Sequence, residues 1–188
     1  MITGGSGGIG ECTARLFSKH GAKLVIADVQ DELGLSLCKD LHGYSSTYVH
    51  CDVTSEHDIV NAVNTTISKY GKLYIMFNWA GILDKMKPNI VEFEKSDFEK
   101  VIGVNMVGTF LGTKHAARVM IPRKKGSIIS MASVCGSMGG LGTYGYVSSK
   151  HGVIGIMRNA AVDLGRYGIR VNCVSPYAVA TAMSKGFL

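Results

Sequence analysis

The first 28 residues, MITGGSGGIGECTARLFSKHGAKLVIAD (Met1 to Asp28), decide the expected fold. They contain a glycine-rich turn, a segment with apolar residues at helical spacing, and an apolar strand at 23–27 that ends at Asp28. A glycine turn that opens a helix lets backbone N–H groups and the positive helix end meet a pyrophosphate. An acid about 20 residues later accepts ribose hydroxyls. A flexible linker, the alternative, would not be followed by a patterned helix and strand. The dinucleotide-binding residues predicted here are Gly4, Ser6, Gly8, Ile9, Gly10 and Asp28.

Strands and helices alternate through the rest of the chain. The predicted strands cover residues 46–50, 73–77, 126–132 and 169–174, and the predicted helices cover 31–41, 55–70, 97–120 and 143–164. Ser96 is the expected N-cap of the third of these helices, with Glu99 completing a capping box. The alternation predicts an α/β fold with a Rossmann-like, doubly wound parallel sheet. Ligands of such sheets bind beyond the carboxyl ends of the strands.

Tyr146 and Lys150 are the strongest candidates for chemistry, because residues four apart share one face of a helix. A free phenol has a pKa of about 10, and a cation within about 4–6 Å shifts a pKa by roughly 1–3 units. Lys150 and a nicotinium ring together would make Tyr146 a proton acceptor near neutral pH, with Ser133 holding the substrate oxygen. The alternative is a tyrosine packed on a lysine stem. Tyr144 is excluded, because its i+4 residue is Ser148.

Composition narrows the class of protein. The 188 residues are 46% hydrophobic and 18% charged, which predicts one globular domain over residues 1–188. We expect no membrane span, because no apolar run approaches about 20 residues. We expect no signal peptide, because no charged-then-apolar pattern follows Met1. Five scattered cysteines predict reduced thiols, no metal site and a cytoplasmic location. The net charge is +6, but we interpret the basic cluster at 123–125 as helix-end cations rather than a nucleic-acid site.

Several polar residues fall at the carboxyl ends of predicted strands, where a ligand would bind. Asp52 either caps the following helix or contacts an adenine, and the two roles do not exclude each other. Asn105, an amide within an otherwise apolar helix, is either a satisfied core group or the holder of a water in a proton relay. The other strand-end segments are 78–81, Ser133 and 175–177.

These motifs together resemble the short-chain dehydrogenase/reductase family over essentially the whole chain. The matching residues are Thr3-Gly4-xxx-Gly8-Ile9-Gly10, Asp52-Val53, Asn78-x-Ala80-Gly81, Asn105, Ser133, Tyr146-xxx-Lys150 and Ser175-Pro176. Residues 75–82 and 175–181 look most like a plant branch of secondary-alcohol dehydrogenases, such as secoisolariciresinol and borneol dehydrogenases.

The resemblance implies a function and assigns roles. It implies oxidation of a secondary alcohol or reduction of a ketone, with Tyr146 as acid/base, Lys150 lowering its pKa, Ser133 orienting the substrate and Asn105 holding a relay water. It implies cofactor contacts from Asp52, Val53, Asn78, Ala80, Gly81, Tyr146, Lys150, Pro176 and Val179, besides the glycine turn. Asp28 favours NAD, because its carboxylate would repel the 2′-phosphate of NADP. A homo-oligomer, dimer or tetramer, is expected through the helices that begin near Asp97 and Thr143.

The sequence departs from the family pattern in three places. Trp79 replaces an amide, and its bulk would crowd the cofactor or disturb the strand end. Ala178 replaces a glycine and would be strained at positive φ. Only three residues precede the glycine turn, and the family's substrate-covering segment lies beyond Leu188, so we expect both ends of the fold to be shortened and the first strand nearly absent. A catalytically silent nucleotide-binding or partner-binding protein is therefore the alternative function.

Overall fold

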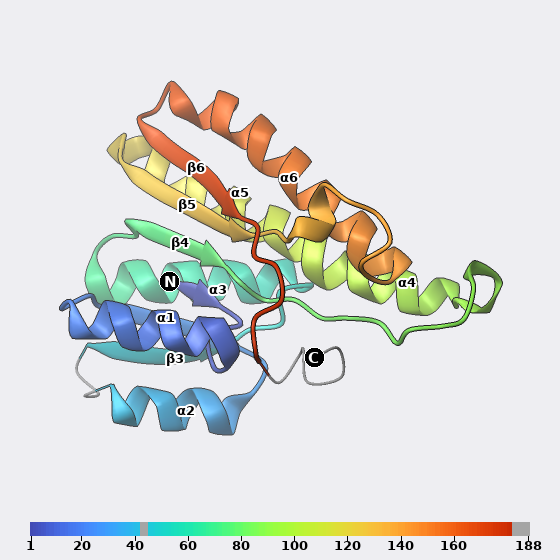
Figure 1. Cartoon of the computed structure of the whole chain (residues 1–188). Helices are drawn as coiled ribbons and strands as arrows, with labels where there is room; N and C mark the ends of the chain where they lie inside the picture. Colours follow the sequence, from blue (N-terminus) through green and yellow to red (C-terminus); the bar gives the residue numbers. More distant parts are fainter. Residues whose placement is uncertain (42–44, 182–188) are drawn as a thin grey trace.

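A single parallel sheet organises the computed structural model, which describes residues 1–41 and 45–181. Six strands pair in the order β3-β2-β1-β4-β5-β6, all parallel (Figure 1). They are β1 (Ile2–Thr3), β2 (Leu24–Asp28), β3 (Ser46–His50), β4 (Ile75–Asn78), β5 (Gly126–Met131) and β6 (Ile169–Val174). The predicted doubly wound α/β fold is confirmed.

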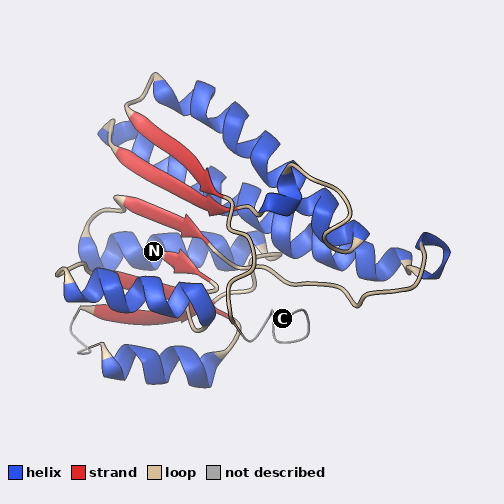
Figure 2. Ribbon diagram, viewed as in Figure 1, coloured by secondary structure: helices blue, strands red, loops and turns tan. Residues whose placement is uncertain are grey.

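Helices cover both faces of this sheet (Figure 2). The main ones are α1 (Gly8–Lys19), α2 (Asp31–Asp40), α3 (Glu56–Tyr70), α4 (Lys95–Ile102), α5 (Gly108–Met120) and α6 (Tyr144–Gly165). One core cluster packs the sheet against α3, α5 and α6, and includes Ile59, Met120 and Val153. A second packs it against α1 and α2, and includes Ala14 and Leu37. The carboxyl ends of all the strands therefore meet at one edge, between the two helical layers.

The first strand is shorter than its neighbours but occupies the centre of the sheet. Ile2 and Thr3 pair with β2 on one side and β4 on the other. The main chain of Met1 continues the pairing, since its carbonyl accepts from the Phe77 N–H at 2.9 Å and its amino group donates to the Ile75 carbonyl at 2.9 Å. The strand that we expected to be nearly absent is two residues long, and these residues give both neighbours a ladder partner next to the glycine turn.

The long helix predicted over residues 97–120 is interrupted. A π-helical segment, Gly103–Val107, separates α4 from α5. The predicted capping box is also wrong, because α4 begins at Lys95 with Glu94 as N-cap, and Ser96 lies inside the helix. The Glu94 carbonyl already accepts the Phe98 N–H at 3.1 Å, so the helical ladder starts before the local capping signal.

The basic cluster lies at the end of α5, as expected for helix-end cations. Arg123 closes a short 3₁₀ turn, Ile121–Arg123, and Lys124 follows in the left-handed conformation (φ 47°). Lys125 lies over the Tyr74 ring, with 5.8 Å between its ammonium nitrogen and the ring centroid.

In the described part of the chain no helix combines the length and apolar character needed to cross a bilayer.

Candidate active site

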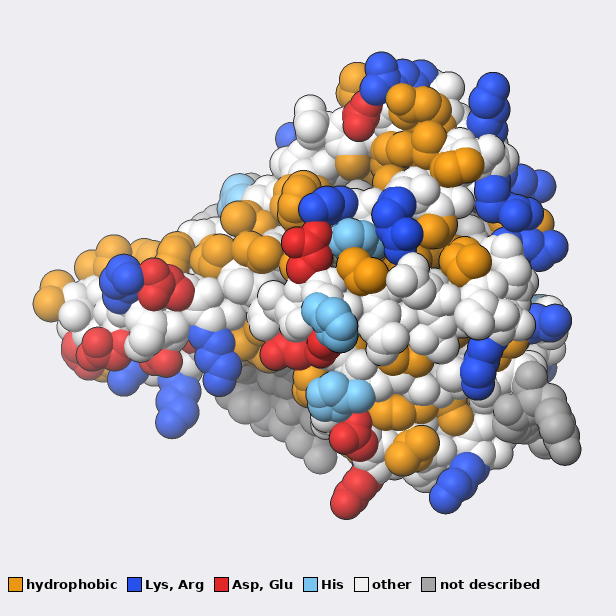
Figure 3. Space-filling view, turned by 180° about the vertical axis from the view of Figure 1, so that it is seen from behind, with side chains coloured by type: hydrophobic (Ala, Val, Ile, Leu, Met, Phe, Trp, Pro, Cys, Tyr) orange, Lys and Arg blue, Asp and Glu red, His pale blue; other side chains and the backbone are white. Residues whose placement is uncertain are grey.

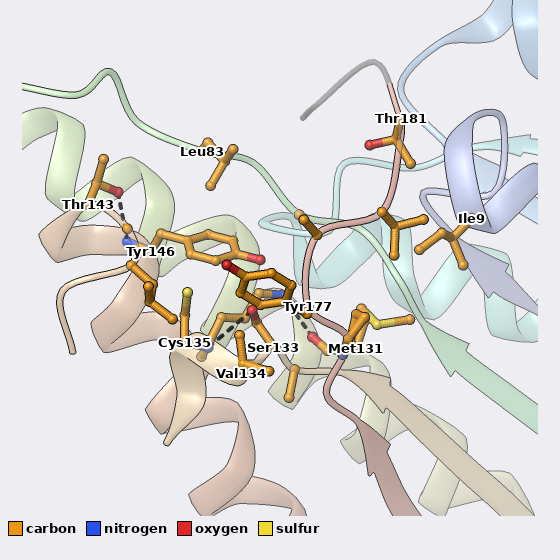
Figure 4. Close-up of a pocket in the computed structure, with 18 of the residues that line it drawn as sticks. Ile9, Leu83, Met131, Ser133, Val134, Cys135, Thr143, Tyr146, Tyr177 and Thr181 are labelled. Carbon is orange, nitrogen blue, oxygen red and sulfur yellow. Dashed lines mark hydrogen bonds between the residues drawn. The ribbon is translucent and has the colours of Figure 1, made fainter. Parts of the chain in front are cut away.

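Two adjoining cavities lie at the carboxyl edge of the sheet. The larger, about 540 Å³, is lined by the glycine turn, Asp28 and the segment after β3. The smaller, about 280 Å³, is lined by Ser133, Tyr146 and Lys150 (Figure 4). Trp79, Gly81 and Thr181 line both cavities, so the two are continuous. The arrangement offers a nucleotide-sized cleft that leads directly to a tyrosine, a lysine and a serine.

The glycine turn is built so that backbone, rather than side chains, faces the larger cavity. Gly4 (φ 63°) and Gly8 (φ 55°) occupy the left-handed region, which glycine adopts without strain. A Cβ at Gly4 would lie 2.7 Å from the Cα of Ala80, and one at Gly10 would lie 2.4 Å from the Gly4 carbonyl oxygen. The N-cap of α1, Gly7, makes no side-chain cap bond. The first N–H groups of α1 therefore fit a pyrophosphate.

Asp28 lies at the end of β2 and lines the same cavity, although only 5% of its surface is exposed. Its Oδ2 accepts the Ser6 N–H at 2.9 Å, and its Oδ1 accepts the Gln30 N–H at 3.1 Å. A carboxylate has about four lone-pair sites, so ribose hydroxyls can still donate to it. Ser6 does not line the cavity; its backbone holds the carboxylate in place.

Asp52 lines the larger cavity and shapes the turn before α3. Its Oδ1 accepts from the Thr54 backbone N–H at 2.9 Å and from the Thr54 hydroxyl at 2.8 Å. The N-cap of α3 is Ser55, whose hydroxyl accepts the Asp58 N–H. Of the two roles considered for Asp52, helix capping belongs to Ser55 instead, and Val53 beside it also lines the cavity.

Tyr146 and Lys150 project from the first turns of α6 into the smaller cavity. Ser133 reaches it from the end of β5, and the Tyr146 ring points toward the side where Ser133 and Tyr177 lie (Figure 4). The Lys150 ammonium donates to the Met131 carbonyl at 2.7 Å and lies 5.4 Å from the centroid of the Tyr146 ring. The predicted serine, tyrosine and lysine therefore meet, although they come from two separate elements.

Burial dominates the electrostatics of these groups. Burial raises the pKa of the Tyr146 phenol, and the hydrogen bond with Ser133 opposes that rise. Burial lowers the pKa of the Lys150 ammonium to about 8. The lowering of the pKa of Tyr146 by Lys150 and a nicotinium ring together stays a prediction.

Asn105 sits at the centre of the π-helical segment and is fully buried. Its Oδ1 accepts the Ile82 N–H at 2.8 Å, and its Nδ2 donates to the Ile82 carbonyl at 3.0 Å and to the Ser149 hydroxyl at 3.0 Å. Single-turn π segments often mark functional sites. The amide thus joins the loop after β4 to the helix that carries Tyr146, and a relay water at Asn105 stays a prediction.

The departures from the family pattern cause no visible distortion. Trp79 stacks on Phe77 with 6.3 Å between ring centroids, and a Cβ at Gly10 would lie 2.6 Å from the indole. The strand before Trp79 keeps its full register. Among the described residues, Lys124 is the one non-glycine residue with positive φ, so Ala178 is not strained in the way we expected.

Most of the predicted site residues line the two cavities, but four do not. The lining residues are Gly4, Gly8, Ile9, Asp28, Asp52, Val53, Ala80, Gly81, Ser133, Tyr146, Lys150, Pro176 and Val179. Ser6, Gly10 and Asn105 act from behind the cavity walls. Asn78 points away from the cavities, and its Nδ2 donates to Thr113 at 3.2 Å and to Ser130 at 3.1 Å.

Sequence reasoning missed several wall residues, including Leu83 and Val104. Leu83 lies in a loop without motif, and nothing in its local sequence marks it. Val104 had one signal, its position next to Asn105 on the same predicted helix.

Comparison with known proteins agrees with this geometry. A family model described as short chain dehydrogenase matches residues 1–187. The chain belongs to the short-chain dehydrogenase family. Members of this family use nicotinamide cofactors.

Similar family members are plant dehydrogenases. Secoisolariciresinol dehydrogenase of Forsythia intermedia is 57% identical over 187 residues, which cover 100% of this chain and 68% of that protein. The mitochondrial borneol dehydrogenase of Lavandula x intermedia is 60% identical over 185 residues, which cover 98% of this chain and 70% of that protein. The predicted resemblance to this plant branch is confirmed, and the chain is an oxidoreductase of the short-chain dehydrogenase family.

A solved structure shows the same fold. The crystal structure of levodione reductase superposes with a TM-score of 0.92 at 36% sequence identity, covering 98% of this chain and 73% of that one.

Proposed function

We propose that this short-chain dehydrogenase uses NAD to interconvert a secondary alcohol and a ketone, with Tyr146 as the acid/base. The observation that carries the proposal is the meeting of Ser133, Tyr146 and Lys150 in a cavity continuous with the one beside the glycine turn. Relatives named for borneol and secoisolariciresinol support an alcohol substrate.

Each residue has a distinct role in this proposal. In alcohol oxidation, the Tyr146 phenolate accepts the hydroxyl proton, and the Ser133 hydroxyl holds the substrate oxygen near the phenol. The Lys150 ammonium stabilises the phenolate and donates to a ribose hydroxyl. Asn105 holds a water that continues the proton path. NAD, when bound, supplies the hydride acceptor.

Asp28 supports NAD rather than NADP as the cofactor. Its carboxylate is buried at the rim of the larger cavity and is held by the backbone of Ser6 and Gln30. A 2′-phosphate brought to this place would meet a fixed negative charge, and Val29 and Gln30 supply no cation. We expect kcat/KM with NAD⁺ to exceed that with NADP⁺ by more than tenfold, roughly the effect of 1.4 kcal/mol. Equal values would reject this choice.

The activity is tested by following NADH formation at 340 nm with a panel of apolar secondary alcohols. Tyr146→Phe should abolish turnover while NADH still binds, because the ring is kept and the proton acceptor is lost. Tyr144→Phe is the matched control, since Tyr144 lies two residues away, is 48% exposed and packs edge-on against Phe93. Turnover by Tyr146→Phe at the wild-type rate would exclude the mechanism.

A catalytically silent nucleotide-binding protein is the second candidate. Two observations favour it: burial raises the pKa of Tyr146, and the bulky Trp79 stands where the two cavities meet. NAD binding without turnover of any alcohol in the panel, with the same affinity in Tyr146→Phe, would select this function over the enzyme.

Self-association is part of the same proposal. Phe98, Val107, Phe110 and Val162, from α4 to α6, are between 37% and 82% exposed, and hydrophobic side chains gather along the arm that α4 forms (Figure 3). Covering this surface with a second copy would remove it from water. Light scattering at micromolar concentration should give at least a dimer mass, and a monomer would contradict this.

We also propose a cytoplasmic location, supported by five free cysteines.

A further inference from the structure

A carboxylate outside the expected catalytic set is linked to the backbone of Tyr146. Asp84 lies in the loop that follows β4, and its Oδ1 accepts a hydrogen bond from the Thr143 hydroxyl. The same hydroxyl is the N-cap of α6, where it accepts the Tyr146 N–H at 3.4 Å (Figure 4). Thr143 is 2% exposed, so water does not compete for this chain of bonds.

The second oxygen of Asp84 also faces α6. Its Oδ2 is buried and has no hydrogen-bond partner among the described residues. It would lie 3.2 Å from a Cβ placed at Gly145, in the first turn of the helix. A negative charge is stabilised at a helix N-terminus by the unpaired N–H groups there. Asp84 therefore interacts with the first turn of α6 through both the cap and the charge.

The loop that carries Asp84 is held at a second point. Asn105 binds both the N–H and the carbonyl of Ile82, two residues earlier. Leu83, between these two anchors, lines the smaller cavity together with Thr143. The position of Leu83, which forms this wall of the smaller cavity, relative to the Tyr146 phenol thus depends on the Asn105 and Asp84 contacts.

We propose that Asp84 is a positioning residue of the active site. Through the Thr143 hydroxyl it fixes the first turn of α6, and so sets the Tyr146 phenol against Ser133 and against the Leu83 wall. The proposal rests on the proposed dehydrogenase function. A carboxylate that only caps a helix would change stability but not the kinetic constants of the folded enzyme.

Two pairs of variants separate these roles. Asp84→Ala and Thr143→Ala should each lower kcat/KM for the alcohol by about tenfold, a change of the size that one helix cap contributes. Asp84→Asn and Thr143→Ser should recover most of the lost kcat/KM, because each keeps the acceptor or the donor of the cap; Asp84→Asn loses only the charge. The double alanine variant should be no worse than either single one. Near-wild-type kcat/KM in both alanine variants would overturn the proposal.

Two further readouts exclude general damage to the fold. NADH affinity, measured by quenching of Trp79 fluorescence, should be unchanged, because neither Asp84 nor Thr143 lines the larger cavity. The acidic limb of the pH profile for alcohol oxidation should move to higher pH in Asp84→Ala, because a displaced phenol loses the Ser133 hydrogen bond that lowers its pKa. Equal weakening of NADH binding and turnover would indicate a purely structural role and overturn the proposal.

The inference can fail separately from the proposed function. If the wild type oxidises no alcohol, amide hydrogen exchange in the first turn of α6 still tests the contact. Asp84→Ala and Thr143→Ala should then speed exchange in that turn, and Asp84→Asn should not. Unchanged exchange in both alanine variants would overturn the positioning role.

Discussion

Replacing Lys150 with methionine should make the fold more stable while removing its activity. Lys150 is 4% exposed, and its ammonium donates to the Met131 carbonyl. In the described part of the chain no carboxylate forms a salt bridge with it. We infer that the buried charge lowers the stability of the fold and is retained for its role in the proposed active site.

The size of this effect follows from the pKa of Lys150, which burial lowers from 10.5 to about 8. At about 1.36 kcal/mol per pKa unit, burying the charged form costs about 3 kcal/mol at pH 7. Methionine has a similar length and removes that cost, but it leaves the Met131 carbonyl without its donor, a loss of about 1–2 kcal/mol. We expect the variant to be more stable by about 1–2 kcal/mol at pH 7.

The dependence on pH isolates the electrostatic part. The folded-state pKa lies below the unfolded one, so the unfolded chain binds more protons between about pH 8 and 10.5. Wild-type stability therefore rises with pH through this window, and the variant lacks that gain. The stability of the variant relative to the wild type should fall by about 2–3 kcal/mol between pH 7 and pH 10, so the variant becomes the less stable protein at pH 10.

The assay is urea unfolding of both proteins at pH 7, 8, 9 and 10, with the difference in free energy of unfolding plotted against pH. Lys95→Met is the control, because the Lys95 side chain is 85% exposed and its difference from the wild type should stay flat. A Lys150→Met difference that is the same at pH 7 and pH 10 would refute the argument that the buried ammonium is destabilising.

Four other substitutions test the fold around the site. Gly4→Ala should lower the free energy of unfolding by at least about 2 kcal/mol, because φ is 63° and a Cβ would lie 2.7 Å from the Ala80 backbone. Gly155→Ala, in α6 with no atom within 4 Å of the new Cβ, should instead raise it by up to about 1 kcal/mol; urea midpoints that move in the same direction would contradict this pair. Asn105→Ala should cost about 2–3 kcal/mol and leave the Ile82 N–H fully exchangeable, and protection as in the wild type would speak against its role. Tyr48→Phe should raise the carboxyl pKa of Asp31 in an NMR titration, because the Tyr48 hydrogen bond is the largest cause of its lowering.

Local errors in the sequence interpretation share one physical origin. Ser96 and Glu99 form a correct capping signal, yet the helix begins earlier, at Lys95. Phe93, two residues before that start, packs edge-on against Tyr144 of α6, with 5.1 Å between ring centroids. This contact with α6 joins a partly buried ring to an exposed one and accompanies the earlier start of the helix. Such tertiary contacts act together with local capping signals and can override them.

The interruption of the predicted 97–120 helix has a similar cause. The predicted helix contains no proline, although Gly103 and Gly108, both poor helix formers, flank the interruption. The π-helical segment lets Asn105 bind Ile82 and Ser149, which lie 23 and 44 residues away in sequence. Because these partners are distant in sequence, the hydrophobic periodicity of residues 97–120 does not reveal their contacts with Asn105.

The sequence by itself determined the order of strands and helices, the glycine turn and the Tyr146–Lys150 pair, because periodicity, glycine conformation and helical spacing act over a few neighbouring residues. It also indicated that Ser133 would join them, because the ends of parallel strands meet at one edge. Only the tertiary structure decided that Asp84 reaches the cap of α6, that Asn78 turns away from the cavities, and that burial raises the pKa of Tyr146. These depend on which distant groups lie within a few ångströms and on how much water they exclude, and neither quantity is written in any single stretch of the chain.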